Sequence, residues 1–319
     1  MICLLTRSQL DAAAYDRCVA GSPDRIIYAF SWYLDAVSPD WQVLVLNEYE
    51  AVMPLPVRTR YGINGVVQPL FCHQLGVFSA NEPTPPDRLK AFLTEAGRHF
   101  RYISSYQFHA ANTAMLPRQP EFTGRTNHVL DLREPYETLR SRYSRGRRHH
   151  LKRPPQPPEW TLTDTTDIGP LFDLFLQYNT RGIGRVDPTA GPVLHRLTSA
   201  LLERRCARIR VAQRNGRIEA GSLLVIDQRR IIHLFCAASP DGRRSNARMF
   251  ILDELVREFA GQHRLLDFES PEAEPLARFN QEFGAVAEPY ARWTRNQLPA
   301  AIQWLHRLKT TIHRTFYPR

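Results

Sequence analysis

The C-terminal half of the chain alternates between strand-like and helix-like hydrophobic patterns. Between Ala207 and Arg292 the pattern predicts three neighbouring antiparallel strands, a long amphipathic helix, a strand, a second helix and a last strand. The Asn215-Gly216 pair predicts the first hairpin, because both central residues of a type I′ turn need positive φ. The next two strands are expected over 221–226 and 231–236. The predicted order is therefore βββαβαβ.

The predicted helices of this region have clear faces and ends. The long helix, over 247–260, must pack on a sheet, because its apolar residues recur at spacings of three and four. A short buried strand follows at 265–268, and a helix over 274–283 should end at Gly284 in the left-handed conformation. Upstream, an edge strand is expected over 160–163. Two helices, over 168–178 and 192–205, complete the half.

The N-terminal half repeats much of this order. A helix rich in aromatic residues is expected over 28–37, and a three-strand meander follows over 41–46, 52–57 and 66–71. A helix over 87–100 and strands over 102–108 and 128–132 come next, with a missing or very short helix near 112–116. Self-similarity over half the chain indicates a duplicated architecture.

A basic run over 140–153 and a proline run over 154–158 separate the halves. Prolines stop a helix and mark a boundary. We therefore expect an N-terminal domain over 1–135, a connector over 136–159, and a C-terminal domain with a helical tail over 160–319. The basic run is either a solvated connector or a phosphate-binding strip. The strip would use Arg145, Arg147, Arg148 and Lys152.

Composition narrows the class of protein. The chain has 319 residues, is 43% hydrophobic and carries a formal charge of +10, and no run approaches the ~18 apolar residues of a membrane span. The first apolar run ends at Leu5, too early for a signal peptide, so we expect a cytoplasmic protein. The five cysteines are scattered and are expected to be buried free thiols. The histidine spacings predict no metal site.

Four sequence features in the right order resemble one known family. They are the segment 74–78, the basic connector from Tyr136 to Arg148, the stretch 266–270, and the run from Phe279 through Gly284 to Tyr290. The order of elements looks like the GNAT acyltransferase fold, and its double appearance resembles the FemAB-type transferases. The resemblance implies an α+β fold of two GNAT-like domains, each a mostly antiparallel twisted sheet flanked by helices.

The resemblance also implies transfer of an acyl or aminoacyl group from an activated donor to an amine. In such folds the strands before and after the central helix splay apart and admit the donor. By this analogy the donor would meet Phe235, Cys236 and Ala237 at the end of one strand. The start of the central helix would bind donor phosphates, because its N–H groups and its dipole favour anions. The residues expected there are Arg243, Arg244, Ser245 and Asn246.

The donor and the acceptor stay open at this stage. Gly242 precedes the arginines and no glycine follows them, which suits acetyl-CoA poorly, so both acyl-CoA and aminoacyl-tRNA are candidates. No permanently bound cofactor is expected, tRNA is a candidate partner, and a cell-wall precursor or an amino-containing metabolite is the expected acceptor. Amine acylation needs a base, oxyanion donors and positioning. Glu269 and Tyr290 are the candidate catalytic residues.

Two other classes of function remain. A nucleic-acid-binding protein would explain the charge but should interleave aromatic residues with the basic ones, and Tyr143 is the only aromatic residue in the run. A non-catalytic GNAT-like binding or scaffold protein is also possible, because fold does not fix function. An open, charged slot between the splayed strands would favour the enzyme, and a slot filled by side chains would favour the scaffold.

Overall fold

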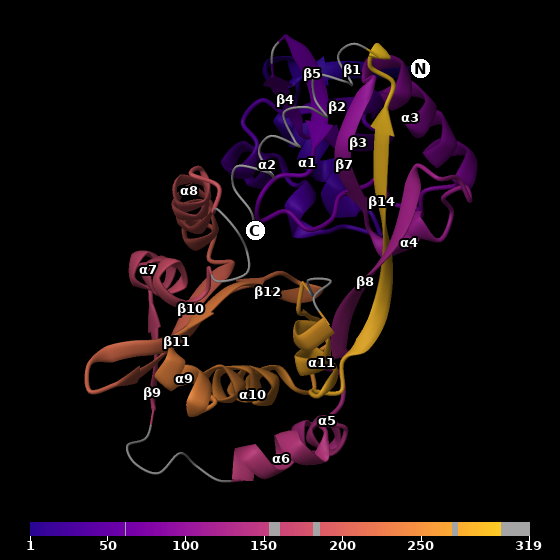
Figure 1. Cartoon of the computed structure of the whole chain (residues 1–319). Helices are drawn as coiled ribbons and strands as arrows, with labels where there is room; N and C mark the ends of the chain where they lie inside the picture. Colours follow the sequence, from indigo (N-terminus) through magenta and orange to yellow (C-terminus); the bar gives the residue numbers. More distant parts are fainter. Residues whose placement is uncertain (61, 153–159, 181–185, 270–273, 301–319) are drawn as a thin grey trace. The chain divides into compact units, whose positions relative to one another are not determined.

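The computed structural model describes residues 1–60, 62–152, 160–180, 186–269 and 274–300 (Figure 1). Contacts divide the chain into two compact units. Of the described residues, unit 1 contains Met1–Arg125 and those from Pro289 to Ala300, and unit 2 contains those between Thr126 and Glu288. The predicted boundaries at 135 and 160 stay a prediction about where the sequence repeats begin and end, because units defined by contacts need not coincide with repeats.

Unit 1 contains a four-stranded sheet in the order β1-β2-β3-β6 and a second run of strands in the order β4-β5-β7-β14. Helix α1 contacts β3 and β6, and α3 contacts β2. The elements are β1 (Ile2–Thr6), α1 (Ala12–Gly21), α2 (Ser31–Val37), β2 (Gln42–Leu46), β3 (Ala51–Leu55), β4 (Val57–Arg60), β5 (Ile63–Val67), β6 (Phe78–Ser79), α3 (Pro86–His99), β7 (Tyr102–Phe108), α4 (Ala110–Thr113) and two short 3₁₀ turns, Arg7–Gln9 and Ile27–Ala29.

The predicted N-terminal meander is wrong in one respect. The strand expected over 52–57 is divided at Pro56: β3 pairs with β2, whereas β4 pairs with β5. Proline has no N–H to continue a ladder, and the Pro56 carbonyl accepts a hydrogen bond from Val67 at 3.0 Å. The third strand accordingly lies at Ile63–Val67, upstream of the predicted 66–71. The very short helix expected near residue 112 is confirmed as α4.

The chain from 207 to 296 has the predicted βββαβαβ order with one additional short helix, over 240–244, where the sequence predicted a loop; most of its last strand belongs to unit 1. Unit 2 has a sheet in the order β8-β13-β12-β11-β10-β9. All neighbours are antiparallel except β12 and β13. The elements are α5 (Tyr136–Ser141), α6 (Arg145–Lys152), β9 (Thr161–Thr165), α7 (Gly169–Tyr178), α8 (Ala190–Glu203), β10 (Ala207–Arg214), β11 (Arg217–Ile226), β12 (Arg230–Ala238), α9 (Pro240–Arg244), α10 (Ala247–Phe259), β13 (Leu265–Asp267) and α11 (Glu274–Gln281).

Local signals in the sequence account for this half. Asn215 and Gly216 have φ of 52° and 74°, so the hairpin joining β10 and β11 has the expected left-handed turn. Gly284 has φ of 79° and ends the α11 region as predicted. Helices α7 and α8 lie on one face of the sheet and α10 on the other (Figure 1).

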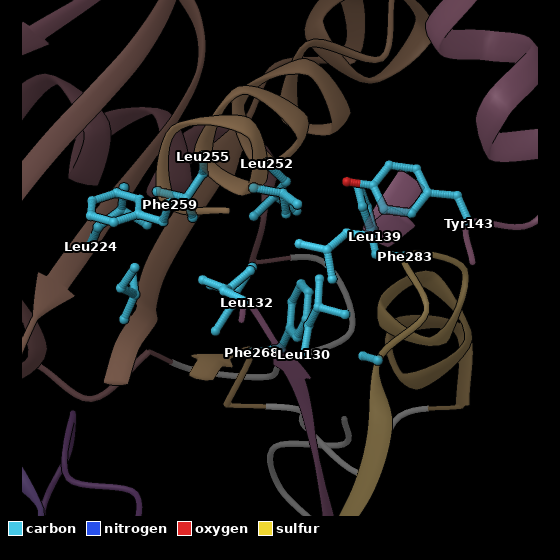
Figure 2. Packing of buried hydrophobic residues seen from close by; sticks show 14 of the residues in the cluster. Leu130, Leu132, Leu139, Tyr143, Leu224, Leu252, Leu255, Phe259, Phe268 and Phe283 are labelled. Atoms are coloured by element: carbon cyan, nitrogen blue, oxygen red, sulfur yellow. The ribbon is translucent and has the colours of Figure 1, made fainter. Parts of the chain in front are cut away.

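The core beneath α10 draws residues from distant parts of the chain. Leu252, Leu255 and Phe259 of α10 belong to one buried cluster with Leu224 of β11 (Figure 2). The same cluster contains Leu130, Leu132 and Phe268. Leu139 and Tyr143, from the segment predicted to be a connector, belong to the same buried cluster. The segment 136–152 forms two helices, α5 and α6, and is not only a connector, because apolar side chains of this segment pack into unit 2. Pro154–Pro158 lie outside the described residues.

Two strands carry the chain between the units. The chain leaves unit 1 within β8 (Phe122–Asp131) and returns within β14 (Val286–Asn296). Asp131, Leu130 and Val129 of β8 pair with β13 in unit 2. Residues Ala291–Asn296 of β14 pair with β7 in unit 1. Each unit thus contains a strand from the other half of the sequence.

Other expectations have mixed outcomes. All five cysteines are free, but only Cys18 and Cys72 are buried, and Cys3 is exposed. Among the helices that the structure describes, none has both the length and the apolar character needed to cross a bilayer. The predicted helical tail beyond residue 300 lies outside the described residues.

Candidate functional site

The parallel strands β12 and β13 part after a short ladder. Among the described residues, the pairing joins Arg230–Ile232 to Leu265–Asp267, whereas β12 continues to Ala238. N–H groups alternate between the two sides of a strand. The Ala238 N–H is bonded to the side-chain oxygen of Asn179 (3.3 Å). We therefore expect the Cys236 N–H to face the same side, which β13 has left.

A cleft of about 720 Å³ lies at this end of β12. The ends of α7 and β12, the short helix α9, the start of α10, and helices α11 and α6 form its walls. The lining residues are Arg147, Gln177, Tyr178, Asn179, Ala238, Pro240, Gly242, Arg243, Asn246, Arg248, Met249, Leu276 and Phe279.

The cleft has a strongly positive lining. Three arginines, Arg147, Arg243 and Arg248, line it, and the described lining residues include no aspartate or glutamate. A concave surface of one charge sign concentrates ligands of the opposite sign. The cleft is therefore suited to an anionic ligand.

The N-terminus of α10 faces this cleft. Its N-cap, Asn246, has left-handed backbone (φ 60°) and makes no side-chain capping bond. Asn246, Arg248 and Met249 of this first turn line the cleft. The leading N–H groups and the positive end of the dipole of a 13-residue helix can thus meet an anion.

The two predicted arginines differ in position. Arg243 lines the cleft, and its Nη2 donates to the Tyr178 carbonyl at 2.6 Å. Arg244 instead pairs with Asp241 one turn back, and its side chain is 73% exposed. Ser245 donates to the Asp241 carbonyl at 2.6 Å. Of the predicted phosphate-binding group, Arg243 and Asn246 are therefore at the cleft.

Gly242 has a packing role. A Cβ there would lie 2.1 Å from the Glu219 carbonyl oxygen of β11, so only glycine lets α9 approach the sheet this closely. Ser239 caps α9 by accepting from the Gly242 N–H at 2.9 Å. The same hydroxyl donates to the Glu219 carboxylate. These contacts fix the turn that carries Arg243.

The predicted strand-end residues have different surroundings. The buried Phe235 ring packs on Phe172 and Phe175 of α7, at centroid distances of 6.2 and 5.2 Å. Ala237 is fully buried. The Cys236 Sγ lies 3.7 Å from Nη1 of Arg248. None of the three side chains is among the described lining residues, so any donor contact they make would be through the backbone.

The predicted phosphate strip does not behave as one surface. Arg145 and Arg148 are exposed on α6, whereas Arg147 is buried and lines the cleft. The pKa of Arg147 is lowered, mainly by burial; Glu282 opposes this shift, and the charge of Arg248 adds to it. The side chain of Lys152 lies outside the described residues. Within the strip, Arg147 is thus the residue brought to the cleft.

The two candidate catalytic residues lie in different units. Glu269 follows β13 with a φ of 43°, and its N–H donates to Asp267 at 2.9 Å. Tyr290 is buried in unit 1, where its ring meets His73 edge-on at 4.8 Å. Neither is among the described lining residues of the cleft. Their catalytic roles stay predictions.

Asp267 holds the end of β13. It is 2% exposed and accepts hydrogen bonds from Asn127 and Arg230, both at 2.8 Å. Arg230 also bonds Glu288 of β14 at 2.7 and 2.9 Å. This buried network fixes the point from which β12 and β13 part.

Unit 1 has a corresponding parallel pair, β5 and β7, but its slot is occupied. After β5 the chain continues to bond β7: Leu75 N–H donates to the Gln107 carbonyl at 2.7 Å, and His109 N–H donates to the Leu75 carbonyl at 2.9 Å. Leu75 is fully buried. A Cβ on Gly76 would lie 2.5 Å from atoms of both His109 and Asn112. The segment 74–78 therefore occupies the side of β7 beyond the end of its ladder with β5.

Sequence reasoning missed several lining residues. Arg248 lies within the first turn of the predicted central helix, and its charge at a helix start was the available signal. Asn179 had no local signal, because only folding brings the end of α7 to α10. Phe279 belongs to the family-like run 279–290, but nothing in that run indicates that its ring would lie at the cleft. The described residues contain no cluster of His, Cys, Asp and Glu suited to a metal ion.

Comparisons with known proteins agree with this geometry. Residues 138–273 match the family model of the acetyltransferase (GNAT) domain, a span that includes the cleft from α6 to α10. The sequence matches no curated protein.

Several solved structures are similar in fold. FemX has a TM-score of 0.63 at 11% identity, over 90% of this chain and 97% of that one. The C-terminal domain of a putative lysylphosphatidylglycerol synthetase from Agrobacterium fabrum has 0.53 at 12%, over 95% and 97%. A tandem GNAT protein from the clavulanic acid biosynthesis pathway has 0.51 at 13%, over 94% and 100%. The predicted fold of two GNAT-like domains is confirmed, and the match to the family model supports an acyltransferase.

Proposed function

We propose that the protein is an N-acyltransferase that binds its activated acyl donor in the cleft of unit 2. The observation that carries the proposal is the open cleft at the end of β12, where three arginines and the start of α10 meet. An activated donor with phosphate groups provides the anion that this lining requires. On the side of β12 that β13 has left, the Cys236 N–H could donate to the acyl carbonyl.

The chemistry requires few groups. The amine nitrogen attacks the acyl carbonyl carbon, a C–N bond forms, and the bond from that carbon to the leaving sulfur or oxygen breaks. The leaving group keeps the bond electrons. A base takes the proton from the amine. We propose Glu269 as this base and keep Tyr290 as the second candidate.

The two units have different roles in this proposal. The cleft at the end of β12 in unit 2 is open and charged, which favours the enzyme over a scaffold, whereas the space beside β7 in unit 1 is filled by 74–78. Unit 1 therefore would not take the donor in the same manner. A cell-wall precursor or an amino-containing metabolite is the proposed acceptor class, and the cytoplasm is the proposed location.

Acyl-CoA and aminoacyl-tRNA are the two proposed donors. The net charge of +10 and the exposed Arg145 and Arg148 favour the larger polyanion, as does the absence of a glycine after Arg243 in the turn. A polyanion releases counterions on binding, so its affinity falls steeply with salt. Titration of labelled tRNA and of acetyl-CoA at about 50 and 200 mM salt separates the donors. Salt-insensitive binding of acetyl-CoA without tRNA binding would contradict the tRNA donor and leave a CoA-dependent enzyme.

Replacement of Arg243 by alanine tests the donor site. We expect Arg243→Ala to weaken donor binding roughly tenfold or more, since a charge-assisted hydrogen bond contributes about 1.5–3 kcal/mol. The matched control is Arg244→Ala, because that side chain is exposed and pairs with Asp241. Isothermal titration calorimetry with each donor measures the donor affinity of both variants. Equal affinities for wild type and Arg243→Ala would place the donor elsewhere.

A further inference from the structure

One wall of the cleft comes from outside the sheet and its covering helices. Arg147 belongs to α6, in the segment that the sequence suggested was a connector. Its side chain is only 5% exposed, yet it lines the cleft. A long cationic side chain is seldom buried this deeply unless its charge is paired.

Arg147 and Arg248 share one aromatic ring. The guanidinium carbon of Arg147 lies 4.3 Å from the centroid of the Phe279 ring, and that of Arg248 lies 4.1 Å from the same centroid. Arg147 also lies 4.6 Å from the centroid of Phe283. Contacts with ring faces hold a guanidinium in place but leave its in-plane N–H groups available.

The charges in this group are not balanced. Arg147 donates to the Glu282 carboxylate at 2.5 Å and to the Phe279 carbonyl at 3.3 Å. Its Nε is buried and has no hydrogen-bond partner among the described residues. Arg248 has a contact with the Cys236 sulfur at 3.7 Å. One carboxylate therefore accompanies two neighbouring cations, and a buried donor is left unsatisfied.

We propose that Arg147 and Arg248, held by Phe279, together bind one oxyanion group of the substrate in this cleft. The inference rests on the proposed function, because it concerns the same cleft. A planar guanidinium fork matches the paired oxygens of a phosphate or a carboxylate. The group would be a phosphate of the donor or a carboxylate of the acceptor. Its binding requires Arg147 to share or exchange the Glu282 carboxylate.

The test uses inorganic pyrophosphate and malonate as probes, with calorimetry on the whole chain. We expect Arg147→Met and Arg248→Met each to weaken binding of the preferred probe about tenfold, as expected for loss of a charge-assisted contact. Preference for pyrophosphate assigns the site to a donor phosphate, and preference for malonate assigns it to an acceptor carboxylate. Arg204→Met is the charge-matched control, since Arg204 ends α8 and is not among the lining residues.

A second variant separates ligand binding from a structural tie between α6 and α11. Glu282→Gln removes the competing carboxylate and keeps both arginines. We expect it to tighten probe binding at least a fewfold, even where the melting temperature falls. If Arg147 is only a structural tie, Glu282→Gln will leave probe affinity unchanged or weaker, and Arg147→Met will bind as wild type. Either result overturns the inference.

Activity assays distinguish this inference from the proposed function. Acyl transfer that survives in the Arg147→Met, Arg248→Met double variant at unchanged KM would refute oxyanion binding by the two arginines and leave the enzyme assignment standing. Probe binding that depends on both arginines, in a protein inactive with every donor tested, would refute the enzyme assignment and leave oxyanion binding by the two arginines standing.

Discussion

At the residue scale, His233 makes stability depend on pH. His233 lies in β12, and its Nε2 is 2.8 Å from the hydroxyl oxygen of buried Ser222 in β11. Burial, with the charge of Arg248, lowers the pKa of His233 to about 3. In the unfolded chain this imidazole titrates near 6.5, so below that pH the unfolded state binds a proton that the folded state does not.

We therefore expect stability to fall as the pH drops from 6.5 towards 3. The loss should be about 1.4 kcal/mol per pH unit from this group. Urea unfolding at about pH 6.5 and 4.5 measures it. His233→Gln keeps a polar partner for Ser222 and removes the titration, so its free energy of unfolding should change less between these pH values. An equal change in both proteins would show that other groups cause the dependence.

At the element scale, the position of Arg243 depends on the cap of α9. Ser239 satisfies the Gly242 N–H and also bonds Glu219 of the neighbouring strand. Ser239→Ala should lower the free energy of unfolding by about 1 kcal/mol, the usual effect of losing an N-cap. It should also weaken donor binding, because α9 then holds Arg243 less firmly.

The conservative variant Ser239→Thr is the control for this element. A threonine hydroxyl can make the same capping bond. We expect Ser239→Thr to restore most of both the stability and the affinity. Donor affinity that is unchanged in Ser239→Ala would show that the cap stabilises α9 without positioning the cleft arginine. Chemical denaturation and donor titration on the same samples give both quantities.

At the scale of the whole molecule, unit 1 depends on the end of the chain. Its strand β7 pairs with residues Ala291–Asn296 of β14, and Trp293 of that segment is 2% exposed. A chain that ends at Glu288 lacks this strand and exposes the edge of β7. We expect fast amide exchange throughout β7 in that protein, with β11 and β12 still protected.

Hydrogen exchange with mass spectrometry measures this difference. A chain that ends at Ala300 keeps β14 and serves as the matched control. Unchanged protection of β7 in the shorter protein would mean that unit 1 folds without its last strand. Loss of protection in β11 and β12 as well would mean that the two units unfold together.

The sequence by itself determined most elements of unit 2 from β10 to α11, but not the short helix α9 or the helices α5 and α6. The Asn215-Gly216 turn, the apolar face of α10 and the left-handed Gly284 follow from neighbours in the chain, because turn chemistry and hydrophobic period are local properties. The resemblance to tandem GNAT proteins rested on that order. The sequence predicts Arg243, Arg244, Ser245 and Asn246 as anion-binding residues because a helix start attracts anions wherever it lies, and two of them, Arg243 and Asn246, line the cleft.

Only the tertiary structure decided how the halves share their strands and which side chains meet. Sequence periodicity cannot distinguish a β14 that pairs within its own half from one that pairs with β7. The pattern of the basic run 140–153 does not indicate that Arg147 is buried against Phe279, because that contact joins residues of α6 and α11 that are far apart in the sequence. The filling of the unit 1 slot by Leu75 is likewise a long-range packing outcome.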